Sequence, residues 1–221
     1  MGFNCGCPAG AHLADLGNQV CGEGFGQIQK VIIQRIYSSG ATKNVIPATG
    51  TGSILNKANL TTLFTANDGT KMVITPFLQN PEDTPGEART FGGGNQTLNG
   101  IEIVVGINPT EFSGIMYEVP QSIIKVMKSY TCENIGVYYI DEYGNIGCKD
   151  MGDNTNVGPI PIQLNSFFVG DKKFGGLEEP DSNAIGWKHA ANWSDDLVII
   201  KREDLDYDPL TDLANIASTS L

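Results

Sequence analysis

The sequence predicts a mainly β fold, a β-sandwich or barrel with one short flanking α-helix and long loops or arms. Short runs rich in β-branched residues recur along the 221 residues, separated by glycine, asparagine and proline. Only one segment, 120–130, carries apolar residues at clear helical spacing. Hydrophobic residues make up 40% of the chain, which is enough for a buried core.

Three regions follow from the composition. Residues 1–25 are small, polar and glycine-rich, which predicts an N-terminal arm. Residues 26–205 carry the strand patterns and form the predicted β-sandwich domain, and the acidic stretch 206–221 reads as a C-terminal tail across a surface. No run of about 18 apolar residues occurs, so we expect no contact with a membrane.

The first half of the domain predicts strands and one long loop. Residues 26–37 are dominated by β-branched side chains and predict a strand. Residues 53–66 fit either a helix or a strand, and 71–78 predict a strand that Pro76 limits to an edge or an end. Residues 79–100 show no regular pattern, and a loop of about 20 residues indicates function or contact with a neighbour.

A strong strand and the helix come next. Residues 101–107 (IEIVVGI) predict a strand, and 108–119 a further one. Residues 120–130 predict the helix, with Pro120 at the first helical position, where its missing N–H costs nothing. The apolar stripe of this helix consists of Ile123, Met127 and Tyr130, widened by Ile124 and Val126.

The last part of the domain alternates hairpin, strand and loop. Residues 135–148 predict a hairpin whose turn is 141–145, because Asp, Gly and Asn adopt turn conformations readily. Residues 160–169 predict a strand, 172–186 a polar loop, and 197–200 a final strand. The turn at 141–145 lacks the spacing of a calcium loop, so we expect a solvated turn without a metal.

The charge is strongly acidic and unevenly distributed. The net charge is −11, of which residues 133–221 contribute −10 through 16 acidic and 6 basic groups. Such a surface does not favour binding to a phosphate backbone. It fits either a protein kept soluble by acidic loops or one that lets nucleic acid pass without adhering.

The cysteines and histidines suggest no metal centre and no catalytic centre. The chain has five cysteines, an odd number, which favours reduced thiols in a cytosolic setting. The spacing of Cys5, Cys7 and Cys21, even with His12, does not match a zinc module, and Cys132 and Cys148 read as buried free thiols. No nucleophile motif accompanies His189, so we expect a packed or surface histidine and no cofactor.

The order of these elements resembles that of the tail tube (major tail) proteins of long-tailed bacteriophages. The resemblance covers most of residues 26–205 and is carried by the long stretch 79–100, IEIVVGI, SIIKVMKSY, the hairpin YYIDEYGNIG and the closing ANWSDDLVII. It implies a virion subunit, made in the host cytoplasm. Six copies would close a ring through their sheets, and rings would stack to conduct DNA.

The resemblance also implies partners and contact residues. The partners are other copies of the chain, with a tape-measure protein and DNA in the lumen but without specific binding. Residues 79–100 would form the contact between rings, with Glu82, Asp83, Glu87 and Arg89 as its polar groups.

Three alternatives remain open at this stage. The chain fits another phage particle component, such as a capsid, connector or tail-terminator protein. It also fits a carbohydrate- or ligand-binding β-sandwich that uses Trp187 and Trp193 as a platform, although paired tryptophans are more often part of a core. A hydrolase with two carboxylates across a cleft is the remaining alternative.

Overall fold

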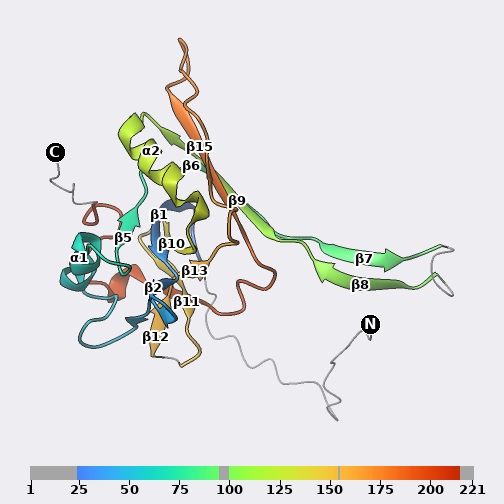
Figure 1. The fold of residues 1–221 in the computed structure, drawn as a ribbon, viewed down its shortest axis with the longest axis horizontal. Helices are drawn as coiled ribbons and strands as arrows, with labels where there is room; N and C mark the ends of the chain where they lie inside the picture. Colours follow the sequence, from blue (N-terminus) through green and yellow to red (C-terminus); the bar gives the residue numbers. More distant parts are fainter. Residues whose placement is uncertain (1–23, 95–99, 154, 215–221) are drawn as a thin grey trace.

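The computed structural model describes residues 24–94, 100–153 and 155–214. These residues form two packed antiparallel sheets and a two-stranded ribbon that projects far from them (Figure 1). The predicted mainly β fold is confirmed. In the described parts of the chain, no helix is long and apolar enough to cross a membrane.

The larger sheet, which we call the central sheet, is built around β10. Its strands are in the order β4 (Ile46–Pro47), β12 (Asn156–Gly158), β11 (Ile146–Asp150), β10 (Ile135–Asp141), β1 (Ile28–Arg35) and β5 (Met72–Ile74). In addition, β13 (Ile160–Pro161) pairs with β10, and β16 (Leu197–Ile200) pairs with β11. Every residue of β10 is buried, because both faces of the sheet are covered.

The smaller sheet, which we call the outer sheet, covers one face of the central sheet. Its order is β14 (Phe168–Val169), β15 (Ser182–His189), β9 (Thr110–Tyr117) and β6 (Gln79–Thr84). Buried and exposed residues alternate along β9 and β15, as in a sheet with one face in the core. The exposed face therefore remains available on the molecular surface.

Two hydrophobic cores lie on opposite faces of the central sheet. The first core joins Val31, Val137 and Tyr139 to the outer sheet and to helix α2 (Gln121–Lys128), which a 3₁₀ turn η2 (Ser129–Cys132) extends. The second core joins the alternate residues of the same strands, among them Ile32 and Tyr138, to helix α1 (Lys57–Thr65). Strand alternation thus divides one sheet between two cores.

The C-terminal segment belongs to the second core as far as it is described. Leu205, Tyr207 and Leu213 are buried there, after the 3₁₀ turn η3 (Arg202–Asp204). The Tyr207 hydroxyl donates to the carbonyl of Ile54 at 2.9 Å. Residues 206–213, expected to be a tail, are therefore packed into the body.

The helices differ from the expectation in three ways. The described residues contain two α-helices instead of one, because 57–65, left open between helix and strand, is helical. Pro120 is the N-cap of α2 and not its first helical residue. Ile123 and Val126 are exposed, so the buried stripe of the helix consists of Ile124 and Met127.

The predicted strands are confirmed in part. The hairpin of β10 and β11 and the final strand at 197–200 are present as predicted. The segment 160–169 is not one strand but the two short strands β13 and β14, and the expected loop 172–186 contains the start of β15. Asn183 and Gly186 interrupt the apolar alternation of β15, which explains why the sequence pattern does not predict that strand.

The long stretch 79–100 is not structureless where it is described. It contains β6 and strand β7 (Ala88–Gly92), which pairs with β8 (Glu102–Ile107). A separate small hairpin joins β2 (Tyr37–Ser39) to β3 (Thr42–Lys43). Of the cysteines, Cys148 is buried as expected but Cys132 is exposed, while Cys5, Cys7, Cys21 and His12 lie outside the described residues.

Candidate assembly interface

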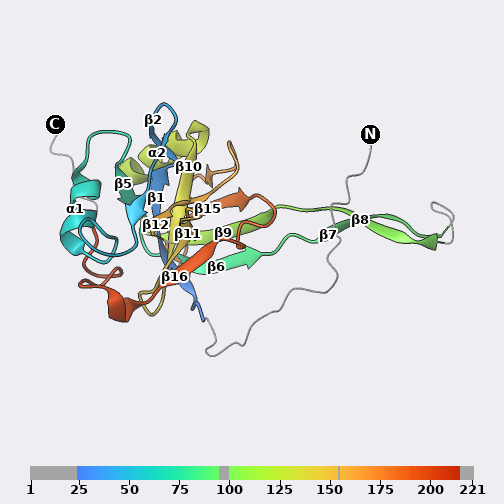
Figure 2. The ribbon, with the colours of Figure 1, turned by 90° about the horizontal axis from the view of Figure 1, so that it is seen from below.

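Strands β7 and β8 form a ribbon that extends well beyond the body. They continue the paired strands β6 and β9 of the outer sheet past the edge of the other two strands, and the two views agree on this projection (Figures 1 and 2). An isolated two-stranded ribbon is marginally stable at best in water. This ribbon therefore requires support from outside the chain's own body.

The ribbon carries large apolar side chains in contact with solvent. Each of them exposes between 41% and 61% of its surface: Phe91, Ile101, Ile103, Val104, Val105 and Ile107. None of them belongs to either hydrophobic core. A contiguous exposed apolar surface on a soluble protein marks an interaction site.

The register of the ribbon assigns these side chains to two faces. Paired residues of antiparallel strands point to the same side, and successive residues to opposite sides. Thr90 pairs with Val104, and Phe91 with Ile103, so one face receives the apolar side chain of Val104 and the other receives the apolar pair Phe91 and Ile103. A bulge between Arg89 and Thr90 shifts the register.

The four predicted contact residues do not form one cluster. Glu82 and Asp83 belong to β6 in the outer sheet, where they pair with Ser113 and Phe112. Glu87 lies at the base of the ribbon, and its carbonyl accepts a hydrogen bond from the Asn108 amide at 2.9 Å.

Arg89 is the one predicted contact residue within the ribbon strands. A Cβ placed on Gly106, its cross-strand partner, would lie 2.8 Å from Nη2 of Arg89. The guanidinium therefore extends across the ribbon over the glycine. A side chain at position 106 would displace it.

The apolar residues of the ribbon are the ones that the sequence reasoning missed. It predicted 101–107 as a strand but did not identify it as a contact surface. The available signal was the composition of IEIVVGI, which is apolar at consecutive positions, as in strands buried on both faces. Among residues 24–94, 100–153 and 155–214, the apolar side chains of the ribbon are exposed and belong to neither core, which points to cover from elsewhere.

A buried polar network connects the two sheets. The Trp187 Nε1–H donates to the Tyr139 hydroxyl at 3.0 Å, and that hydroxyl lies 2.6 Å from Nε2 of His189. Nδ1 of His189 is 2.8 Å from the Pro161 carbonyl, which can only accept, so Nδ1 carries the proton and Nε2 accepts. Burial lowers the pKa of His189 to about 4, and the hydrogen bond to Pro161 opposes this shift.

This network confirms that His189 is a packed histidine. His189 is fully buried and Trp187 is 2% exposed, so Trp187 is not available as a platform for a sugar. Trp193 stacks on the His189 ring, with centroids 4.6 Å apart. The tryptophans therefore support the core, and the carbohydrate-binding alternative loses the feature on which it depended.

The predicted turn at 141–145 is organised by Asp141. Its carboxylate accepts hydrogen bonds from the backbone amides of Gly26, Tyr143 and Asn145, and from the Asn145 side chain. Asp141 is fully buried, whereas the sequence predicted a solvated turn. These donors satisfy the carboxylate, which gives it a structural role.

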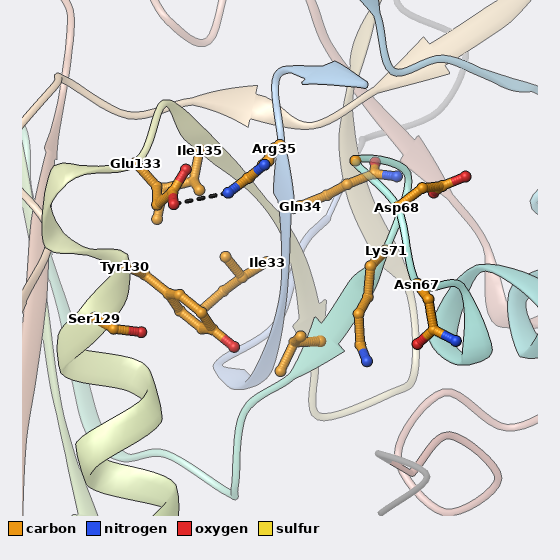
Figure 3. Close-up of a pocket in the computed structure, with 12 residues that line it drawn as sticks. Ile33, Gln34, Arg35, Asn67, Asp68, Lys71, Ser129, Tyr130, Glu133 and Ile135 are labelled. Atoms are coloured by element: carbon orange, nitrogen blue, oxygen red, sulfur yellow. Dashed lines mark hydrogen bonds and ion pairs between the residues drawn. The ribbon is translucent and has the colours of Figure 1, made fainter. Parts of the chain in front are cut away.

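A cavity of about 500 Å³ lies between strands β1 and β5 on one side and η2 on the other (Figure 3). Some of its charged groups already have partners. Arg35 forms an ion pair with Glu133 at 2.7 Å, and the Asp68 carboxylate accepts hydrogen bonds from the backbone amide and the hydroxyl of Thr70. The twelve lining residues include neither histidine nor cysteine. The cavity therefore offers no nucleophile activated by a histidine.

A scan of protein-family models and a comparison with curated proteins give no match to this chain. Among solved structures, it is similar to a chain of the virion of a native gene transfer agent particle, with 13% identity and a TM-score of 0.32 over 55% of this chain and 83% of that one. It is also similar to a chain of the tail of an empty gene transfer agent particle, determined by helical refinement with C6 symmetry. The identity there is 13% and the TM-score 0.30, over 56% of this chain and 86% of that one. TM-scores this low support no conclusion about function, so the function proposed below is argued from this chain's own residues.

Proposed function

We propose that this chain is a structural subunit of a phage-type virion, whose copies assemble into stacked rings that form a DNA-conducting tail tube. The observation that carries the proposal is the projecting β7–β8 ribbon, whose apolar side chains are exposed while the body encloses two cores of its own. Fully burying a side chain such as Val, Ile or Phe contributes about 1.5–3 kcal/mol. Contacts with other copies provide that burial.

The edges of the outer sheet also favour assembly. Within the described residues, β6 and β14 are its two edge strands. Unpaired strand edges are sites of pairing with other chains. Pairing β6 of one copy with β14 of the next would join the outer sheets around a ring, and six is the number of copies that the tail-tube resemblance implies.

The predicted contact residues divide between two proposed contacts. Glu87 and Arg89, at the base and on a strand of the ribbon, are candidates for the contact between stacked rings. Glu82 and Asp83, in the edge strand β6, are candidates for the contact within a ring. Neither contact requires a cofactor or a metal.

The net charge of −11 supports a lumen through which DNA passes without adhering. A tape-measure protein and DNA would occupy this lumen, as the tail-tube resemblance implies. Repulsion between acidic surfaces and phosphates disfavours specific binding of DNA.

Negative-stain electron microscopy of the purified full-length chain tests this function. We expect rings of six copies, or tubes of stacked rings with a central channel. Closed shells or single unstacked rings would favour a capsid, connector or tail-terminator protein instead. Isolated monomers at every concentration would contradict all of these structural roles.

A further inference from the structure

We propose that each β7–β8 ribbon is enclosed by two other copies of this chain, one on each of its faces. The inference rests on the proposed function, because it takes self-assembly as given and specifies the contacts of the ribbon. It predicts that a ribbon is inserted between two neighbours and does not lie on the surface of a single neighbour.

Both faces of the ribbon require cover. The first face carries Val104 with Thr90, and the second carries Ile103 with Phe91. Each of the three apolar side chains exposes more than half of its surface. A ribbon that lay on one surface would be expected to keep a polar face toward water, as antiparallel sheets with one solvated face do.

The size of the ribbon also favours enclosure. Strands rise about 3.4 Å per residue and lie about 4.8 Å apart, so one flat face of β7–β8 covers only about 200 Å². A partner in a standard protein–protein interface contributes about 800 Å². One face alone is therefore too small for a stable contact. Both faces and the strand edges together offer a substantially larger contact area.

The charges favour copies of this same chain as the neighbours. The chain as a whole is strongly acidic, so whole copies repel one another. The ribbon strands carry only Arg89 and Glu102, and these balance each other. The ribbon is thus the element through which acidic copies can approach with the least repulsion.

These two charges lie on different faces. Glu102 pairs with Gly92 on the face of Val104, whereas Arg89 pairs with Gly106 on the face of Phe91. A two-fold dimer would place the same face of each ribbon together and leave the other face in water. Head-to-tail contacts cover both faces with different neighbours, and such contacts close into rings or continue as filaments.

Site-specific photo-crosslinking of the full chain tests this inference. Benzoylphenylalanine replaces Phe91 in one variant and Val104 in a second, and a third variant carries both replacements. Assembled protein is isolated by sedimentation and irradiated, and the linked peptides are identified by mass spectrometry. We expect both positions to link to other copies at two different peptides, and the double variant to give linked species larger than dimers.

Different outcomes would overturn different claims. Assemblies in which both positions link to the same peptide, or in which only one position links, would overturn the enclosure of the ribbon and leave the proposed function intact. Protein that sediments only as a monomer without either replacement would overturn the proposed function, and the enclosure with it.

Discussion

Tyr139 connects the two sheets through one buried hydroxyl group. It lies on β10 of the central sheet, and both of its hydrogen-bond partners, Trp187 and His189, lie on β15 of the outer sheet. Burial raises the pKa of Tyr139 well above its ordinary value, so the hydroxyl stays protonated and can donate to His189. This one contact therefore fixes how the sheets pack.

Replacing Tyr139 with phenylalanine removes two buried hydrogen bonds, the one from the Trp187 N–H at 3.0 Å and the one to His189, and leaves only the longer bond from Trp187 Nε1 to Nε2 of His189 at 3.2 Å. We expect the free energy of unfolding to fall by about 1–3 kcal/mol, because each lost hydrogen bond contributes about 0.5–1.5 kcal/mol. Urea denaturation followed by tryptophan fluorescence measures the change. Tyr143→Phe is the matched control, because Tyr143 is 68% exposed and its loss should change little; equal effects of the two variants would contradict the role of the network.

The protonation of His189 predicts a loss of stability in acid. Its pKa is about 4 in the folded chain and about 6.5 when unfolded, so the unfolded chain binds more protons between these values. The shifted pKa of His189 therefore contributes about 3 kcal/mol to the free energy of unfolding above about pH 6.5. This contribution is lost as the pH falls toward 4.

His189→Gln separates this effect from that of the acidic residues, because glutamine does not titrate. We expect the variant to be less stable than the natural chain at pH 7 and the difference to narrow at pH 4.5. Urea denaturation at both pH values gives the two differences. A difference that stays constant between them would show that His189 does not gain a proton on unfolding.

Residue chemistry predicted the environment of His189 but not its partners. The absence of a nucleophile motif indicated a packed or surface histidine, and the structure shows that it is packed. Its partners Tyr139 and Pro161 lie 50 and 28 positions away in the chain, and no local pattern relates them. Spacing within one segment cannot show contacts that depend on how two sheets pack.

At the scale of elements, helix α2 offers a test of which face is buried. Ile124 is fully buried in the first core, whereas Val126 is 53% exposed. We expect Ile124→Ala to lower the free energy of unfolding by about 2–5 kcal/mol through lost burial and a cavity. Val126→Ala should change it by less than about 0.5 kcal/mol, and thermal or urea unfolding of both variants measures the contrast; similar losses would mean that the face is misassigned.

The ribbon should be dispensable for folding and necessary for assembly. Its residues belong to neither core, and Thr84 and Glu111 still pair at its base. We expect a variant in which Asn-Gly replaces residues 86–109 to keep its free energy of unfolding to within about 1 kcal/mol, because Asn-Gly forms a two-residue hairpin turn. Circular dichroism and size-exclusion chromatography should show a folded protein that no longer forms large assemblies; an unfolded product would show that the ribbon supports the body.

The elements differ in how far the sequence predicts them. The hairpin of β10 and β11 has dense apolar runs and a turn rich in Asp, Gly and Asn, and it is found as predicted. The strand β7 is not evident, because Arg89, Thr90 and Gly92 form no apolar alternation. The sequence does not show that β7 pairs with β8, so 79–100 was expected as a loop although 101–107 was predicted as a strand.

At the scale of the whole molecule, an acidic body carries a nearly neutral apolar projection. The body encloses two cores around one central sheet and is complete within the chain. The ribbon is the part that this body leaves uncovered. The resemblance to tail tube proteins predicted a subunit of an assembly with its contact between rings in 79–100, while the apolar residues of β7 and β8 became candidates for that contact only through their exposure.

Sedimentation velocity of ribbon variants tests the central claim, that the ribbon joins copies of this chain, most directly. The ribbon variant is Ile103→Ser with Val104→Ser, which replaces one exposed apolar side chain on each face with serine. The control is Ile123→Ser with Val126→Ser, which makes the same kind of change on the exposed side of α2. We predict that the natural chain and the control sediment as large assemblies and that the ribbon variant sediments only as much smaller species, single rings or the 23.7 kDa monomer. Identical sedimentation of the natural chain and the ribbon variant at all concentrations would contradict the claim.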